Sequence, residues 1–251
     1  MDAYVWQLPL LFAVGILAGI LNVLAGGGSL MTLPLLIFMG LPSAVANGTN
    51  RIAIFCQNLF AVRGFRKRGV MPLDLALLCT PPALLGSWLG ASLAVNLDDQ
   101  VFNRLLAIIM LGVMVFTALD PMKHFRRDNV VFGFWRKVVL VITFFGVGIY
   151  GGFVQAGIGF IVITALLVHG LDLVRINAVK VFVIFSYTII ALAVFIYHGQ
   201  IDYVLGIALA VGNSIGGMLG PKLAVAKGHD WIKKMVTVTV FVFALKLLLF
   251  P

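Results

Sequence analysis

Ala25-Gly26-Gly27-Gly28-Ser29 interrupts one hydrophobic stretch of the chain, and Gln155-Ala156-Gly157-Ile158-Gly159 interrupts another. The hydrophobic runs at 28–40 and 158–170 that accompany these breaks hold 13 residues each. A helix of that length is about 20 Å long, whereas the hydrocarbon core of a bilayer is about 30 Å thick. Each break is therefore predicted to lie beside a helix that is too short to cross a membrane alone.

The composition predicts that the rest of the chain lies in lipid. Of the 251 residues, 62% are hydrophobic and only 11% are charged, and the mean hydropathy is +1.11. A soluble domain could not cover so much apolar surface. The other hydrophobic runs are long enough to span, which needs about 20 residues; they occur at 8–24, 45–65, 71–95, 101–119, 137–154, 176–197, 203–225 and 231–250. We therefore predict an all-α integral membrane protein.

The two breaks belong to an internal repeat. Gly27 and Gly157 are 130 positions apart. The same offset, without gaps, matches Gly40 with Gly170, Asn47 with Asn177, Gly69 with Gly199, Gly86 with Gly216 and Gly90 with Gly220. Glycines and an asparagine that keep one register indicate a duplication. We predict a first transmembrane repeat at 1–119, a linker at 120–136 and a second repeat at 137–251.

The distribution of Lys and Arg predicts the orientation. Basic residues gather in the links near 63–68, 123–137 and 222–234, whereas the links 96–100 and 198–202 contain none. Cytoplasmic loops carry an excess of Lys and Arg, so the linker 120–136 is predicted to be cytoplasmic. The link at 66–68 and its repeat partner near 198 then lie on opposite faces, as in inverted-topology repeats. Both termini of this multi-pass protein of the cell inner membrane are expected outside the cytoplasm.

Inverted repeats require an odd number of crossings in each half, and two models satisfy this. Each half could cross five times, twice with short helices. Alternatively, each half begins with a re-entrant helical hairpin, at 8–40 and 137–170, followed by three transmembrane helices. We favour the hairpins because irregular backbone at this depth is tolerated where protein covers it. The sequence leaves the choice open.

The hairpin model predicts an anion site at the two tips. Each second arm begins at its break, so its free N–H groups and positive dipole end point into the protein. The carbonyl ends of the first arms could hold a cation such as Na⁺. The alternative is that the glycines only allow close helix packing. The site residues expected from this pattern are Gly26, Gly27, Gly28, Ser29, Gln155, Gly157 and Gly159.

Polar residues near the start of the next run in each half extend the predicted site. Arg51 and Lys180 are the cations best placed to meet an anion, although either could instead extend to the membrane surface. Asn47 and Asn177 share a repeat position and could line the ligand or brace the hairpins. This group of expected substrate-binding residues is Asn47, Thr49, Asn50, Arg51, Asn177 and Lys180. Asn22 and Asn213 are explained at least as well by helix–helix hydrogen bonds.

Missing residue types narrow the function. The chain contains nine Asp and no Glu, and no Asp falls in the middle of a hydrophobic run. Because a cation would find no buried carboxylate, the predicted substrate is a small anion. We expect no catalytic residues, no cofactor and no metal, because no known catalytic or metal-binding motif is present. The basic links favour a lipid bilayer over nucleic acid as partner, and the sequence leaves a homodimer open.

Several of these motifs resemble the TauE/SafE sulfite exporter family. They are Ala25-Gly26-Gly27-Gly28-Ser29, Leu33-Pro34-Leu35-Leu36, Gly40 and Gly48-Thr49-Asn50, with support from the second break at 157–159. The second half departs from the pattern at Thr164, which replaces the proline, and at Ile158, which interrupts the glycines. The resemblance implies a pseudosymmetric permease for sulfite or organosulfonates.

The predicted function is therefore transport of a small anion, most simply sulfite or an organosulfonate, by alternating access between the glycine-rich tips. Two other functions stay open at this point. One is an anion channel of the same architecture, and the other is a membrane assembly subunit that transports nothing. An enzyme is not expected.

Overall fold

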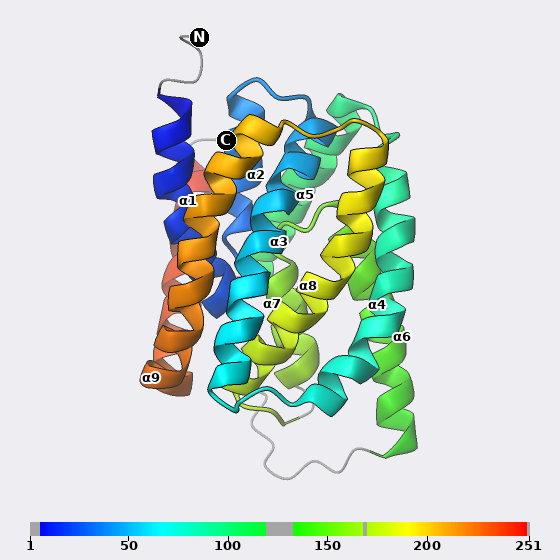
Figure 1. The fold of residues 1–251 in the computed structure, drawn as a ribbon, viewed down its shortest axis with the longest axis vertical. Coiled ribbons are helices and arrows are strands. Elements are labelled where there is room, and N and C mark those ends of the chain that lie inside the picture. The colour runs from blue at the N-terminus through cyan, green and yellow to red at the C-terminus, as the bar shows by residue number, and fades with distance from the viewer. Residues whose placement is uncertain (1–5, 119–132, 168–169, 250–251) are drawn as a thin grey trace.

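The computed structural model describes residues 6–118, 133–167 and 170–249, with the backbone alone at 113–118, 228–230 and 232–249. All elements in these ranges are helices (Figure 1), as predicted. They are α1 (Gln7–Leu24), α2 (Ser29–Phe38), α3 (Ser43–Lys67), α4 (Leu73–Ala94), α5 (Asp99–Ala118), α6 (Phe134–Phe153), α7 (Ile158–Leu167), α8 (Leu173–Tyr197) and α9 (Tyr203–Leu249).

The longer helices are suited to lipid. Five of them, including the Tyr203–Lys227 part of α9, are long and apolar enough to cross a membrane. Large apolar side chains are exposed around the bundle, for example Leu17, Phe38, Trp88 and Ile142. Helices that are apolar on the outside as well as toward the core need an apolar solvent. The structure thus supports membrane localisation.

Two short helices follow the glycine breaks. α2 and α7 have ten residues each, about 15 Å of helix, which is half the thickness of a bilayer core. In Figure 1, α1 descends from the upper end of the molecule and α2 returns toward it, whereas α6 rises from the lower end and α7 returns there. Both breaks lie inside the bundle.

Corresponding helices of the two halves begin at positions separated by the 130-residue offset of the sequence. α3 and α8 both have 25 residues and begin at Ser43 and Leu173. α4 and α9 begin at Leu73 and Tyr203, again 130 positions apart. α9 is longer than expected, because the runs 203–225 and 231–250 fall within one helix of 47 residues. Its later part, drawn red in Figure 1, turns back alongside the bundle.

The linker predicted at 120–136 overlaps the start of a helix in the structure. α6 begins at Phe134, so the last residues of the predicted linker 120–136 are helical. The earlier part of that linker, with Lys123, Arg126 and Arg127, lies outside the described residues. Because these residues are not described, the limits of the two repeats and of the linker stay a prediction.

Glycines allow the first helix of each half to pack tightly on a helix of the other half. A Cβ on Gly90 of α4 would overlap the carbonyl oxygen of Ile149 on α6. A Cβ on Gly216 of α9 would lie 2.6 Å from the Cα of Gly19 on α1. Close helix packing is therefore the role of Gly90 and Gly216 in this fold. These contacts pack the first helices closely against the opposite half.

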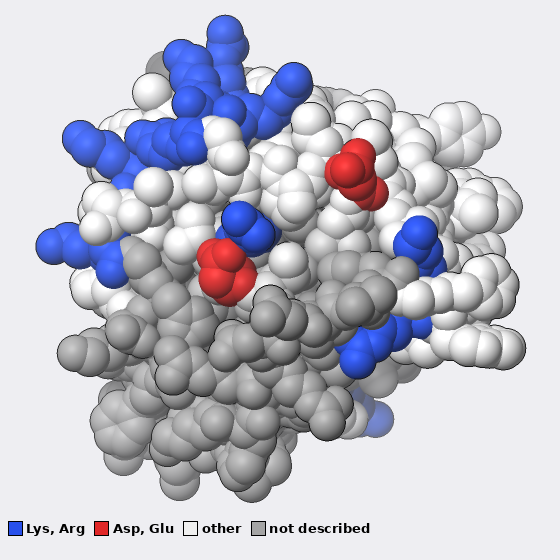
Figure 2. All heavy atoms as spheres, turned by 90° about the horizontal axis from the view of Figure 1, so that it is seen from below, with Lys and Arg blue, Asp and Glu red and all other residues white. Residues whose placement is uncertain are grey.

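Charge is unevenly distributed between the two ends of the bundle. The lower end, where α3 ends and α4, α6 and α8 begin, carries several groups of Lys and Arg and fewer acidic residues in the part of the chain that the structure describes (Figure 2). The basic residues at these helix ends include Arg66, Lys67, Arg136, Lys137 and Arg175. At the other end, the link between α8 and α9 contains Asp202 and no Lys or Arg.

Candidate functional site

The two glycine breaks touch each other in the centre of the bundle. A Cβ on Gly26 would overlap the Cα of Gly159, and a Cβ on Gly159 would overlap the Cα of Gly26. Gly26 also has a φ of 81°, which disfavours residues with a side chain. The breaks come from segments more than a hundred residues apart, and their backbones meet without any intervening side chain.

A small polar pocket lies beside this contact. Its lining comes from both breaks and from α1, α2, α3, α7 and α8. The lining residues are Asn22, Gly26, Ser29, Ile54, Gln57, Asn58, Gln155, Ile158, Gly159 and Ile184. The polar members are amides and a hydroxyl, and none is acidic. The free volume is about 10 Å³, roughly the space of one water molecule.

A hydrogen-bond chain fixes one side of the pocket. The backbone N–H of Ser29 donates to Asn22 Oδ1 at 3.1 Å. Asn22 Nδ2 then donates to Gln57 Oε1 at 3.1 Å, and Asn213 Nδ2 donates to the same oxygen at 3.3 Å. Since a backbone N–H can only donate, the orientation of both amides follows from it. Gln57 therefore keeps the two N–H bonds of Nε2 for other partners.

The second break is held by Gln155, which has a φ of 63°. Its Oε1 accepts from Arg51 NH1 at 3.4 Å, and its Nε2 donates to Thr188 Oγ1 at 3.2 Å. Tyr150 further braces this segment by donating its hydroxyl hydrogen to the carbonyl of Ala156. Arg51 is thus linked to the pocket through Gln155, which lines it.

Arg51 caps the carbonyl end of α6. It is 0% exposed, and its guanidinium donates to the carbonyl of Gly151 at 3.1 Å and to that of Gly152. Asn47, one turn earlier on α3, donates Nδ2 to the carbonyl of Phe153 at 2.6 Å. The last carbonyls of a helix have no partner within it, and cations are favoured beside them. The guanidinium carbon also lies 4.7 Å from the ring centre of Phe195.

Lys180 caps the carbonyl end of α1 in the same way. It is 0% exposed and donates to the carbonyl of Val23 at 2.9 Å and to Asn177 Oδ1 at 2.6 Å. Asn177 Nδ2 donates to the carbonyl of Leu24 at 3.0 Å. α3 of the first half therefore caps the first helix of the second half, and α8 of the second half caps α1.

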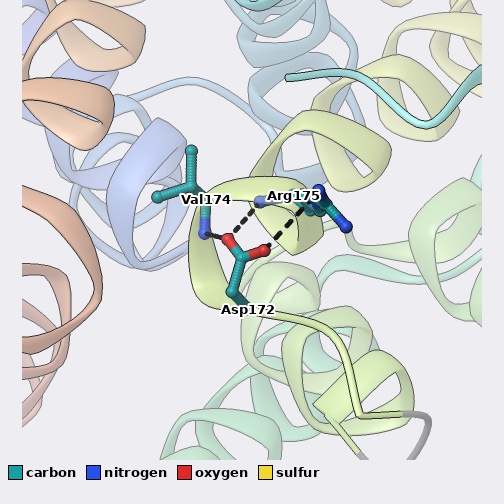
Figure 3. Close-up of polar contacts among 3 residues, drawn as sticks. All are labelled: Asp172, Val174 and Arg175. Carbon is teal, nitrogen blue, oxygen red and sulfur yellow. Dashed lines mark hydrogen bonds and ion pairs between the residues drawn. The ribbon is translucent and has the colours of Figure 1, made fainter. Parts of the chain in front are cut away.

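Asp172 sets the start of the helix that carries Lys180. Its Oδ1 accepts from the backbone N–H groups of Val174 and Arg175 at 2.9 and 3.0 Å, as Figure 3 shows. Oδ2 lies 3.4 Å from Arg175 Nε, but both side chains are largely exposed and this ion pair contributes little. The N-cap fixes where α8 begins, and so fixes the depth of Lys180 two turns later.

Comparison with known proteins assigns the chain to a family. The family model described as "Sulfite exporter TauE/SafE" matches residues 11–247. The chain belongs to the TauE/SafE family. A "Probable membrane transporter protein" of Haemophilus influenzae is 30% identical, with 98% of this chain and 96% of the relative covered. "Probable membrane transporter protein YfcA" of Escherichia coli K12 is 28% identical, covering 96% and 89%. No solved structure matches the chain.

The chain is accordingly a membrane transporter of the TauE/SafE family, and the suspected resemblance is confirmed. The predicted site residues of this TauE/SafE chain fall into two groups, according to whether they lie at the pocket or around it. One group lines the pocket: Gly26, Ser29, Gln155 and Gly159. Gly27, Gly28 and Gly157 lie in the breaks beside it.

The second group surrounds the pocket without lining it. Asn47, Arg51, Asn177 and Lys180 hold helix ends, and neither cation extends to the membrane surface. Thr49 Oγ1 accepts from the backbone N–H of Asp202 at 2.8 Å. Asn50 Oδ1 accepts from Thr32 Oγ1 at 2.7 Å and so ties α2 to α3. Direct contact of this group with substrate stays a prediction.

The sequence analysis of this TauE/SafE chain did not predict three residues at the site. Gln57 and Asn58 line the pocket, and Thr188 accepts a hydrogen bond from Gln155. All are buried in long apolar helices. Polar side chains within membrane helices are themselves a functional signal. Gln57 and Asn58 are polar residues within a membrane helix and so carried this signal. The 130-residue offset pairs them with Tyr187 and Thr188, which are different residue types, so the comparison of the two repeats did not select them.

Proposed function

We propose that this TauE/SafE transporter moves a small oxyanion, sulfite or an organosulfonate, by alternating access at the pocket between the two breaks. The observation that carries the proposal is the pair of buried cationic caps. Each cap neutralises a helix carbonyl end that lies immediately beside a break.

The electrostatic argument starts from the two helix ends at each break. The carbonyl end of α1 and the N–H end of α2 meet at the first break, and their partial charges of about −0.5 and +0.5 oppose each other. Lys180 offsets the carbonyl end and leaves the positive end of α2 dominant. Arg51 does the same for α6 and α7. The region between the breaks then favours negative charge.

The pocket lining agrees with this sign of charge. The free N–H groups of Gln57 and the hydroxyl of Ser29 are available to an anion, whereas no Asp is among the buried residues of the described chain. Each described Asp instead lies in a link or at a helix start, as Asp74 and Asp99 do. A cation would therefore find no counter-charge in the pocket.

The architecture supports alternating access. We propose that the halves are inverted repeats, each a re-entrant hairpin followed by three transmembrane helices, with the basic lower end of the bundle in the cytoplasm. The short arms α2 and α7, the opposite entry of the two hairpins and the equal lengths of α3 and α8 support this. The pocket has room for about one water molecule, so binding of a larger substrate requires the hairpins to separate.

The test is flux into proteoliposomes that contain the purified chain. Radiolabelled sulfite, methanesulfonate, sulfate, acetate and Na⁺ are compared, each with and without an ion gradient. We expect saturable flux of sulfite or the sulfonate and none of Na⁺. Flux of Na⁺ alone would contradict the anion assignment, a large single-channel conductance would identify a channel, and the absence of any flux would favour an assembly subunit.

A further inference from the structure

Gln57 and Asn58, neighbours on α3, both line the pocket and are held in opposite orientations. Both side chains are 1% exposed. The orientation of each is set by a backbone group whose role cannot change, because an N–H only donates and a carbonyl only accepts. The assignment of nitrogen and oxygen in these amides therefore follows from the backbone.

Gln57 offers a donor. The chain of bonds from Ser29 N–H through Asn22 ends on Gln57 Oε1, which Asn213 also contacts. Nε2 donates to no residue in the described part of the chain. Two N–H bonds of a buried amide are thus available to a molecule in the pocket.

Asn58 offers an acceptor. Its Nδ2 donates to the carbonyl oxygen of Ile54 at 2.9 Å, one turn earlier on α3. Oδ1 then has no donor among the residues that the structure describes. A bare oxyanion beside it would face a partial negative charge, whereas a ligand with an O–H group could donate to it.

We infer that the transported substrate is an oxyanion that carries a hydrogen-bond donor of its own. Gln57 Nε2 binds an oxygen of the anion, and Asn58 Oδ1 accepts from a hydroxyl or acid O–H of the same molecule. The inference rests on the proposed function and narrows its substrate class. Hydrogensulfite and short hydroxysulfonates both meet the requirement. Ile54, Ile158 and Ile184 add an apolar wall for the carbon atoms of a sulfonate.

Two ligands that differ in one group test the role of Asn58. Counterflow of 2-hydroxyethanesulfonate and propane-1-sulfonate is measured in the same proteoliposomes, since the second ligand replaces the hydroxyl with a methyl group. The wild-type chain is expected to prefer the hydroxyl ligand about tenfold. Asn58→Leu should bring the ratio close to one. Because the ratio comes from one protein sample, partial loss of folded protein does not change it.

Asn96→Leu is the matched control. Asn96 Nδ2 makes the same bond to a carbonyl one turn earlier, Ser92 at 3.1 Å, but it is exposed and does not line the pocket. The control should keep the wild-type ratio. Equal transport of the two sulfonates by the wild-type chain, or an unchanged ratio in Asn58→Leu, would overturn the inference.

Gln57→Glu tests the donor. A carboxylate still accepts from Asn22 and Asn213, so the hydrogen-bond chain is kept while the two N–H groups are lost. Flux of both sulfonates and of sulfite should fall at least about tenfold, and Gln100→Glu, which adds the same charge at an exposed position, should leave it unchanged. Ligand-induced rise in melting temperature in detergent should also disappear in Gln57→Glu. If this variant does not fold, Gln57→Met takes its place.

One experiment identifies which ligand group donates to Asn58, and its outcomes are separate from those that test the proposed function. Sulfite flux that rises as the pH is lowered, and loses this dependence in Asn58→Leu, assigns the donor to the O–H of hydrogensulfite. A wild-type chain that moves sulfite and both sulfonates equally well at every pH contradicts only the present inference. A wild-type chain that moves none of them contradicts the proposed function itself.

Discussion

Lys180 Nζ donates a hydrogen bond to the carbonyl oxygen of Val23, 2.9 Å away and 157 positions earlier in the chain. The contact joins the second half of the molecule to the carbonyl end of the first helix. Arg51 makes the corresponding contact with Gly151 across 100 positions. Each half therefore supplies a basic side chain to the carbonyl end of the first helix of the other half.

Lys180→Met is expected to lower both stability and anion flux. The substitution keeps a long flexible side chain but leaves the oxygens of Val23 and Asn177 without their donor, at a cost of about 1–3 kcal/mol of folding free energy. The uncapped negative end of α1 should reduce sulfite flux about tenfold. Melting temperature in detergent and flux in proteoliposomes provide the measurements. Lys222→Met, at an exposed position, is the control, and normal flux in Lys180→Met would contradict the capping role.

Arg51→Lys is expected to be almost as damaging as removal of the side chain. The guanidinium of Arg51 bonds to oxygens of Gly151, Asn47 and Gln155, as well as to further carbonyls of α6. An ammonium keeps the charge but cannot present this planar set of donors. We expect a lower melting temperature and at least about fivefold slower flux. Arg63→Lys, on the exposed side of the same helix, should behave as wild type; a similar result for Arg51→Lys would show that charge alone suffices.

Gly159→Ala is expected to stop transport without preventing insertion into the membrane. A methyl group at this position would overlap the Cα of Gly26, so the two breaks could not meet. Gly146→Ala on α6 is a matched control, because a Cβ there would meet nothing within 4 Å. Flux and the amount of protein in the membrane fraction are measured together. Normal flux in Gly159→Ala would mean that the closed contact between the breaks is not part of the transport cycle.

Cysteine labelling tests the inverted topology. Arg68 and His198 are exposed, are 130 positions apart and follow the last residues of α3 and α8. In a background with Cys56→Ala and Cys79→Ala, a membrane-impermeant maleimide should label His198→Cys in intact cells. Arg68→Cys should be labelled only after the membrane is opened. Labelling of both variants from the same side would exclude inverted repeats.

The parts of the fold that the sequence predicted depend on local pattern. Hydrophobic runs, glycine breaks and a constant offset were enough to anticipate α3 and α8 as equivalent helices and to place Gly26 and Gly159 at chain reversals. Such features arise from contacts between near neighbours in the chain and from the length that a bilayer demands. The helical connection between the runs 203–225 and 231–250 within α9 was missed, because polar residues near 227–234 suggested a link.

The partners of the polar residues could not be predicted, because they come from the other half. Their position near the start of a hydrophobic run marked Arg51 and Lys180 as candidates. Whether they face a ligand, the membrane surface or a helix end depends on segments 100 or more positions away. The orientation of the Gln57 amide depends on Ser29, Asn22 and Asn213 together. The spacing of residues along the chain does not show which side chains will form hydrogen bonds with one another in the folded protein.

The cations at Arg51 and Lys180 stay bonded to the protein's own backbone, so they do not travel with the substrate. An anion that crosses without a counter-ion moves one negative charge through the membrane potential, worth about 2.3 kcal/mol per 100 mV. In a cell whose interior is electrically negative, that work is released when the anion leaves. Export would then proceed uphill against its concentration gradient on voltage alone, and a fall in membrane potential would slow it.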